Sequence, residues 1–130
     1  NLFFQVLSPV NLAKLSQAET ANYNFARRVI AGIAENLSNI DECVTAASTH
    51  WSLARMSRVD RNILRLAAYE LQYEEDIPQN VTINEAIEVA KRFGADDSPT
   101  FVNGVLDKIA CDLRKQASQN ELKQAKVAAG

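Results

Sequence analysis

The chain has 130 residues, a length typical of one domain, of which 47% are hydrophobic and 23% are charged. This balance excludes an intrinsically disordered chain, and the small numbers of glycines (four) and prolines (three) favour helices over a turn-rich β-sandwich or barrel. Fourteen basic and sixteen acidic residues give a net charge of −2, which excludes the global positive field of a strongly basic nucleic-acid-binding protein.

The predicted elements begin with an apolar segment, residues 2–7, which has the pattern of the second half of an amphipathic helix. A long helix is predicted from near Ser16 to Leu37, because apolar residues recur there at steps of three and four. Ser38 is the predicted N-cap of a following short helix, and Trp51 lies in the connection after it.

The second half of the chain contains the most apolar pattern, a helix that we predict to begin at the N-cap Ser57. The sequence TINE at residues 82–85 has the form of a capping box and predicts the start of the next helix. Ser98 is the predicted N-cap of the last helix. The prediction is an all-α domain of six or seven helices over residues 1–117, followed by a frayed, polar and Ala-rich tail, residues 118–130.

Two glycines and two asparagines are predicted to have structural roles. Gly94 follows a helix and is expected in the left-handed conformation that ends helices, and Gly104 is expected where two helices approach closely. Asn84 and Asn103, each flanked by apolar residues, are expected to make buried hydrogen bonds.

No catalytic, metal or cofactor site is evident. Cys43 and Cys111 lie far apart and are expected as small buried residues in a reducing compartment, since one histidine does not complete a zinc site with them. His50 has no evident partner that would orient it as a catalytic base. The acidic pair at 96–97 and the acidic triplet at 74–76 lack the spacing of a calcium-binding loop. The sequence has neither a signal peptide nor an apolar run of about 18 residues, so we expect a cytoplasmic protein without a membrane partner.

Basic side chains gather on one predicted helix. Arg58, Arg61 and Arg65 stand at i, i+3 and i+7, which places them on one stripe where guanidinium groups can hold phosphates. The alternative is an ordinary solvated helix face. Phe101, on the first turn of the last helix, is a candidate ring for stacking on an RNA base, with a core position as its alternative.

Several segments resemble the NusB family of transcription antitermination factors. They lie in matching order and spacing within a stretch from about Trp51 to Ala110, which is nearly half of the chain. They are residues 57–71 (SRVDRNILRLAAYEL), 76–78 (DIP), 81–91 (VTINEAIEVAK), 93–98 (FGADDS) and 101–109 (FVNGVLDKI).

The resemblance implies an all-helical protein of two small bundles that is not an enzyme. It implies pairing with the ribosomal protein NusE and binding of the boxA element in nascent ribosomal RNA transcripts, in support of elongation by RNA polymerase. The RNA-binding face of the family includes an arginine-rich segment at the extreme N-terminus, which no part of residues 1–130 matches. Two alternatives stay open: a fragment of an RsmB-like RNA methyltransferase, and a self-associating module that forms a homodimer through an apolar patch near Phe3, Phe4 and Val6.

By the same resemblance, Arg61, Arg65, Asp97, Ser98 and Phe101 lie at or beside the RNA. A carboxylate repels phosphate unless it accepts a hydrogen bond from a base amine, so we hypothesise that Asp97 restrains non-specific affinity.

The predicted contact with NusE is made by the helix that carries Asp60, whose carboxylate suits a basic partner surface. The alternative for Asp60 is an acid favoured by the dipole at the start of its helix.

Overall fold

The computed structural model describes residues 16–49 and 51–129. Within these residues the chain is all-α, with five α-helices, one short 3-10 helix and no strand, which confirms the predicted fold class. The count is lower than the six or seven helices expected, and the predicted helical segment at residues 2–7 lies outside the described residues. The elements are α2 (Gln17–Glu35), α3 (Leu37–Ala47), η2 (Leu53–Arg55), α4 (Arg58–Tyr73), α5 (Gln79–Phe93) and α6 (Ser98–Ala129).

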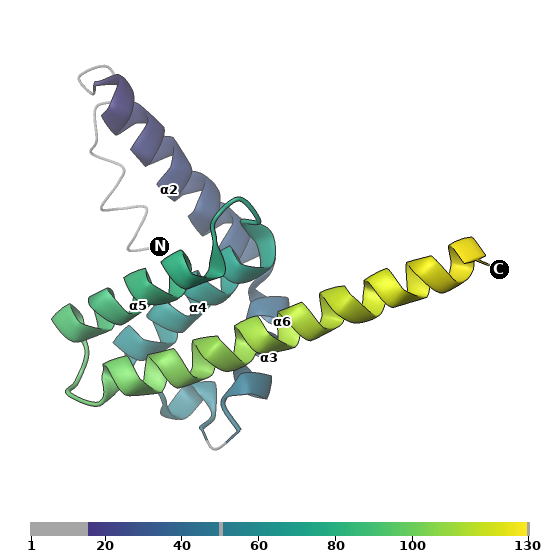
Figure 1. The fold of residues 1–130 in the computed structure, drawn as a ribbon. Helices are drawn as coiled ribbons and strands as arrows, with labels where there is room; N and C mark the ends of the chain where they lie inside the picture. The colour runs from purple at the N-terminus through teal and green to yellow at the C-terminus, as the bar shows by residue number, and fades with distance from the viewer. Residues whose placement is uncertain (1–15, 50, 130) are drawn as a thin grey trace.

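Three helices, α4, α5 and α6, pack side by side and form the main bundle, and α3 packs against α4 and α6 behind it (Figure 1). Each helix supplies an apolar face to one continuous core, because its apolar residues recur at helical spacing. The most deeply buried large side chains of this core are Ile40, Val44, Leu64, Val102, Leu106 and Ile109.

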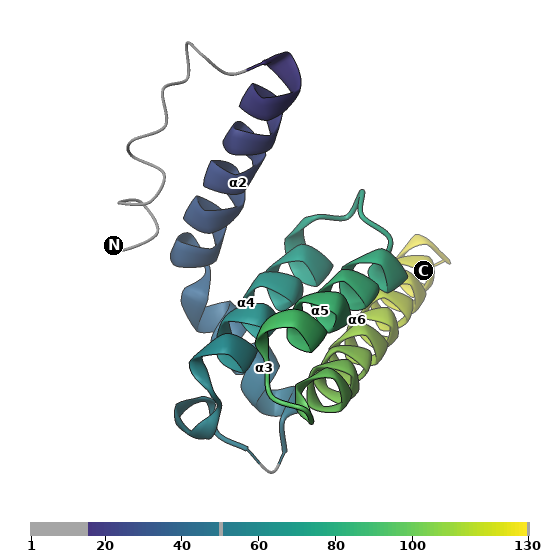
Figure 2. The same ribbon diagram turned by 90° about the vertical axis from the view of Figure 1, so that its left-hand side faces the viewer.

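The long helix α2 contacts α3 and α4, and its N-terminal half stands clear of the main bundle (Figure 2). Val29 is its buried residue, and Arg28 Nη1 lies 2.7 Å from Glu74 Oε1 at the end of α4. A Cβ atom at Gly32 would collide with the ring and hydroxyl of Tyr69, so the absence of a side chain lets α2 approach α4. Thus α2 is the helix packed least against the bundle, whereas α3 shares the core of α4 and α6.

The N-cap predicted at Ser57 is confirmed, and the helix predicted to begin near Ser16 has Ser16 as its N-cap. The hydroxyls of Ser16 and Ser57 each accept a hydrogen bond of 3.1 Å from the backbone N–H three residues on. The N-cap predicted at Ser98 is wrong, because Ser98 is already the first residue of α6 and its hydroxyl accepts from Ala95 N before the helix. The cap predicted at Ser38 is wrong, since Asn36 is the residue before α3 and makes no side-chain cap. Its amide instead donates to Gly32 O (2.8 Å) and satisfies the end of α2, so one residue ends α2 and begins α3.

The capping box predicted at residues 82–85 is also wrong, because α5 starts at Gln79, directly after Pro78. Pro78 is the N-cap of α5 in place of Thr82, so the helix starts four residues earlier than the box predicts. Thr82 is therefore inside the helix and buried, and its hydroxyl donates to Glu70 Oε2 on α4 (3.1 Å).

The structural roles predicted for two glycines and two asparagines are corrected too. Gly94 has φ −91°, outside the left-handed region, and what it requires is space: a Cβ would lie 2.6 Å from Cβ and Oγ of Ser98. A Cβ at Gly104 would meet no atom within 4 Å, so no helix approaches this residue closely. Asn84 and Asn103 are exposed rather than buried.

The last helix does not fray after Ala117 as predicted, since α6 continues through residues 118–129 as one helix. In the part of the chain that the structure describes, none of the helices has the length and apolar character needed to cross a membrane.

Candidate functional site

One surface pocket brings together three of the residues singled out in the sequence, Asp60, Asp97 and Phe101. Its volume is about 150 Å³, and it lies where η2 and the first turn of α4 meet the first turn of α6. The other residues that line it come from the connection before α4 and from its cap: Trp51, Arg55, Met56 and Ser57.

The α4 side of the pocket is fixed by local contacts of the connecting segment. Arg61 Nη1 donates to the carbonyl oxygen of Leu53 (3.1 Å), which ties η2 to the first turns of α4. Met56 is buried and Ser57 caps α4, so the segment enters the helix in one defined direction. These contacts set Trp51 and Arg55 at the mouth of the pocket next to Asp60.

The α6 side is built on a tight turn. The Ser98 side chain is 1% exposed, and its hydroxyl accepts from Ala95 N (2.9 Å). The carbonyl of Asp97 accepts from Phe101 N (3.1 Å) at the start of the helix. Phe101 is partly buried against the core and also lines the pocket. Ser98 is thus buried and holds the turn before α6.

The pocket is acidic and aromatic. One carboxylate oxygen of Asp60, Oδ1, is buried and has no hydrogen-bond partner among the described residues. A buried acceptor in this state is stabilised by any donor that reaches it. Asp97 is exposed at the rim, and Trp51, 52% exposed, offers an indole to the solvent. The site can therefore receive an amine, amide or guanidinium donor beside an aromatic surface. Its lining has two carboxylates against one guanidinium, that of Arg55, so its net charge disfavours phosphate.

The three arginines predicted to form a phosphate stripe have different environments. Arg58 is exposed and makes no ion pair or hydrogen bond within the described part of the chain. Arg61 is engaged with the η2 carbonyl, and Arg65 makes two hydrogen bonds to Asp41 on α3, Nε–Oδ1 2.8 Å and Nη2–Oδ2 2.9 Å. Two of the three guanidinium groups thus hold the fold together, and Arg58 is the one available to a ligand.

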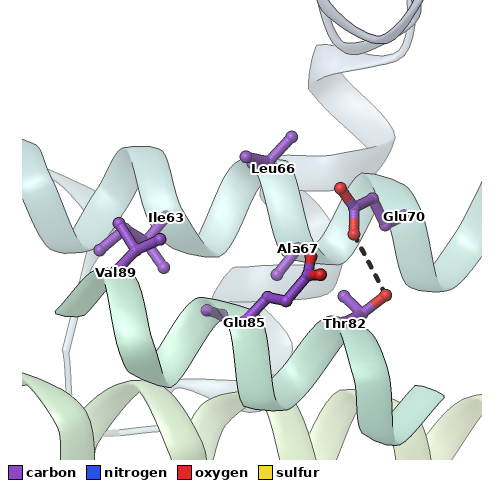
Figure 3. Close-up of a pocket in the computed structure, with 8 residues that line it drawn as sticks. Ile63, Leu66, Ala67, Glu70, Thr82, Glu85 and Val89 are labelled. Atoms are coloured by element: carbon purple, nitrogen blue, oxygen red, sulfur yellow. Dashed lines mark hydrogen bonds between the residues drawn. The ribbon is translucent and has the colours of Figure 1, made fainter. Parts of the chain in front are cut away.

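A second hollow, of about 90 Å³, lies between α4 and α5 and was not predicted (Figure 3). Ile63 and Val89 close one end of it, and the Glu70–Thr82 hydrogen bond lies at the other. Burial raises the pKa of Glu70, against the hydrogen bond from Thr82, which lowers it, and the nearby carboxylates of Glu85 and Glu74 raise it further. This hollow is small, and its mainly apolar lining has two carboxylates and no basic residue, so it does not suit a nucleic acid.

Sequence reasoning missed the contribution of the connecting segment. Trp51, Arg55 and Met56 line the pocket, and the available signal was a tryptophan in a short connection immediately before a helix cap. Among the residues that the structure describes, histidine, cysteine and acidic side chains form no group of three or more that could hold a metal ion.

The chain is similar to known proteins over most of its length. It is 62% identical over 88 residues to the transcription antitermination protein NusB of Geobacter sp. (strain M21), which covers 68% of this chain and 61% of the relative. It is 61% identical over 85 residues to the protein of the same name from Thermotoga maritima, covering 65% of this chain and 60% of that one. The chain thus spans about three fifths of the length of these relatives.

The fold agrees with this similarity. A solved structure of T. maritima NusB matches with a TM-score of 0.70 at 50% identity, over 82% of this chain and 72% of that one. The prediction of a non-enzymatic protein accords with these names, which describe antitermination rather than a reaction. The model of the NusB family matches residues 2–111, and the chain therefore belongs to the NusB family.

Proposed function

We propose that this chain is a transcription antitermination factor that binds the boxA RNA of nascent ribosomal RNA transcripts together with NusE. In this role it supports processive elongation by RNA polymerase in the cytoplasm. The observation that carries the proposal is the pocket between α4 and α6, which joins Asp60, Asp97 and Phe101 in a chain that belongs to the NusB family.

The pocket suits bases rather than phosphates. An exposed carboxylate at Asp97 can accept from the amine of an unpaired base, and Phe101 with Trp51 provides aromatic surface on which a base can stack. Arg58, exposed at the start of α4, supplies a phosphate contact, while Arg61 and Arg65 hold the surface in shape. Ser98 positions Asp97 through its turn.

The partner contact is assigned to Asp60. Its buried, unpaired Oδ1 suits a lysine or arginine of NusE, because a charged donor compensates a desolvated carboxylate better than water does. RNA and NusE would then meet over the same pocket, and each would strengthen the binding of the other.

The test is a salt titration of binding between the chain and a boxA RNA, with and without NusE, beside a scrambled RNA of equal length. We expect boxA to bind more tightly, NusE to increase the difference, and affinity to fall steeply with salt. Equal binding of both RNAs in the presence of NusE would overturn the proposal.

Two variants assign the roles of the acids. Asp97→Asn keeps an acceptor oxygen for a base amine but removes the negative charge that repels phosphate, so it is expected to tighten boxA binding; weaker or unchanged binding would refute that hypothesis. Asp60→Asn is expected to reduce the effect of NusE and to leave binding of RNA alone unchanged.

Self-association is the alternative function, and its predicted patch at Phe3, Phe4 and Val6 lies outside the described residues. Sedimentation of the chain alone distinguishes it: a stable dimer that does not bind boxA RNA favours the alternative over antitermination.

A further inference from the structure

The C-terminal part of the last helix extends beyond the residues that match the family. The family match ends at residue 111, yet α6 continues to Ala129 and projects well beyond the bundle, as the yellow end of the ribbon shows (Figure 1). All residues from 114 to 129 are exposed, and we call this segment the arm.

The arm lacks the apolar face needed to dock on another helix. In the bundle, α6 buries one face through Val102, Ile109 and neighbouring residues. The positions that continue this face along the arm are mostly amides, Gln116, Asn120 and Gln124, and the one large apolar residue on it is Val127, near the end of the helix. Its two large apolar residues, Leu122 (63% exposed) and Val127 (82% exposed), are five residues apart and point to different sides of the helix. A coiled-coil partner would find no continuous stripe here.

What the arm does carry is positive charge. It has four basic residues and one acidic residue, whereas the rest of the chain has ten basic and fifteen acidic residues. Arg114 is partly engaged, since its Nη1 donates to Gln79 Oε1 on α5 (2.8 Å). The other three, Lys115, Lys123 and Lys126, make no ion pair within the described part of the chain, and we call them the arm lysines.

The arm lysines lie on one side of the helix. At 100° per residue they fall within an arc of about 80°, spread over about 16 Å of helix length, and Gln119 lies between them. Glu121, the acid of the arm, lies on the opposite side. An exposed basic stripe flanked by amides matches a flexible polyanion, whose phosphates are spaced along a chain.

We propose that the arm lysines bind the phosphates of single-stranded RNA that flanks the element held at the α4–α6 pocket. The proposal rests on the proposed RNA-binding function, and it extends that function to a second, sequence-independent contact. Both sites lie on α6, and Lys115 is about 21 Å along the helix from Phe101, so one RNA strand that leaves the pocket can follow the helix to the arm. An acidic surface of a second copy of the chain is the competing occupant.

The test compares Lys115→Gln/Lys123→Gln/Lys126→Gln with the unchanged chain, using boxA RNA with and without an unstructured uridine flank. Each phosphate contact to a single strand contributes about 0.7 to the slope of log affinity against log salt, so the variant is expected to lose about 2 of the slope with the flanked RNA. The same change weakens binding at 0.1 M salt by roughly ten- to a hundredfold. Binding of the short RNA is expected to change little.

The matched control removes three positive charges from the bundle instead of the arm. Lys91→Gln/Arg92→Gln/Lys108→Gln changes the net charge equally at exposed positions. If this variant reduces binding of the flanked RNA as much as the arm variant, or if the arm variant binds unchanged, the proposal is overturned. If boxA is not preferred to scrambled RNA but uridine RNA still depends on the arm lysines, the proposed function fails while the arm proposal stands.

A second experiment tests which side of the arm contacts the RNA. A photo-crosslinking residue at Gln119 is expected to capture the uridine flank, and the same residue at Ala117, on the other side of the helix, is not. Capture of a second protein chain from Gln119, with RNA excluded, would instead assign the arm to self-association and refute the proposal.

Discussion

The arginines of α4 offer a sharp test of how the structure divides stability from binding, through the substitutions Arg65→Gln and Arg58→Gln. Arg65 joins α4 to α3 through two hydrogen bonds to Asp41, with 27% and 25% of the two side chains exposed. Arg58 stands in solvent at the first position of α4. Helix charge patterning alone treats the two as equivalent members of one stripe.

Arg65→Gln is expected to have the larger effect on stability, and Arg58→Gln the larger effect on RNA binding. Exposed ion pairs contribute about 0.2–1 kcal/mol, and breaking a buried pair costs about 3–5 kcal/mol. The Arg65 pair lies between these limits, so Arg65→Gln is expected to lower the free energy of unfolding by about 1–3 kcal/mol. Arg58→Gln is expected to change it by less than about 0.5 kcal/mol, since a cation at a helix start gains nothing from the helix dipole.

RNA binding is expected to show the reverse order. Arg58→Gln removes one phosphate contact and about 0.7 from the salt slope, whereas Arg65→Gln leaves the slope unchanged when binding is measured well below the unfolding transition. Urea denaturation and the salt titration read the two properties separately, and adding Asp41→Asn to Arg65→Gln isolates the pair energy. A salt slope reduced by Arg65→Gln, with no loss of stability, would refute this assignment.

Two further predictions concern the bundle itself. Gly32→Ala is expected to lower the free energy of unfolding by about 1–3 kcal/mol, because the added methyl group collides with Tyr69. Gly104→Ala places its methyl group in open space and is expected to raise the free energy of unfolding by up to about 1 kcal/mol. Equal effects of the two variants on thermal unfolding would contradict the close approach at Gly32. Glu70→Gln keeps an acceptor for Thr82, and because burial raises the pKa of Glu70, it is expected to stabilise the fold at pH 7. The gain in stability should vanish below the ordinary glutamate pKa of about 4.3, because Glu70 is then protonated in both the folded and the unfolded chain. An equal gain at pH 7 and below this pKa would disprove the ionisation argument.

Local patterns predicted the parts of the fold that depend on neighbouring residues. The cap predicted at Ser57 depends on a side chain that reaches a backbone group three residues away, and the apolar spacing identified the helix start near Ser16 and the faces that form the core. The capping box at Thr82 failed although its residues were right, because Pro78 starts the helix first. The capping box and the preference of proline for helix starts predict different first residues for α5, and the helix starts after the proline.

Contacts between distant segments explain what the sequence could not predict. Arg65 and Asp41 are 24 residues apart, and helix spacing cannot show that one member of a basic stripe is already paired. Likewise, the close approach was assigned to Gly104 and occurs at Gly32, since only the packing of α2 on Tyr69 reveals it. The pocket itself needs η2, α4 and α6 together, so Asp60, Asp97 and Phe101 could be named in advance but not placed side by side.

The position of the two acids suggests why base recognition and phosphate binding would be separated in this chain. Helix N-termini attract anions, and both α4 and α6 begin at the pocket. Asp60, in the first turn of α4, and Asp97, directly before α6, already occupy these ends with carboxylates, so a phosphate gains nothing there. In the proposed function, the pocket therefore accepts donors from bases or from NusE, and phosphates are left to Arg58 and to the arm. Sequence preference and salt-dependent affinity would then depend on different surfaces. Variants in the pocket should change the ratio of boxA binding to scrambled RNA binding. Variants of the arm should weaken binding of flanked boxA RNA and flanked scrambled RNA equally.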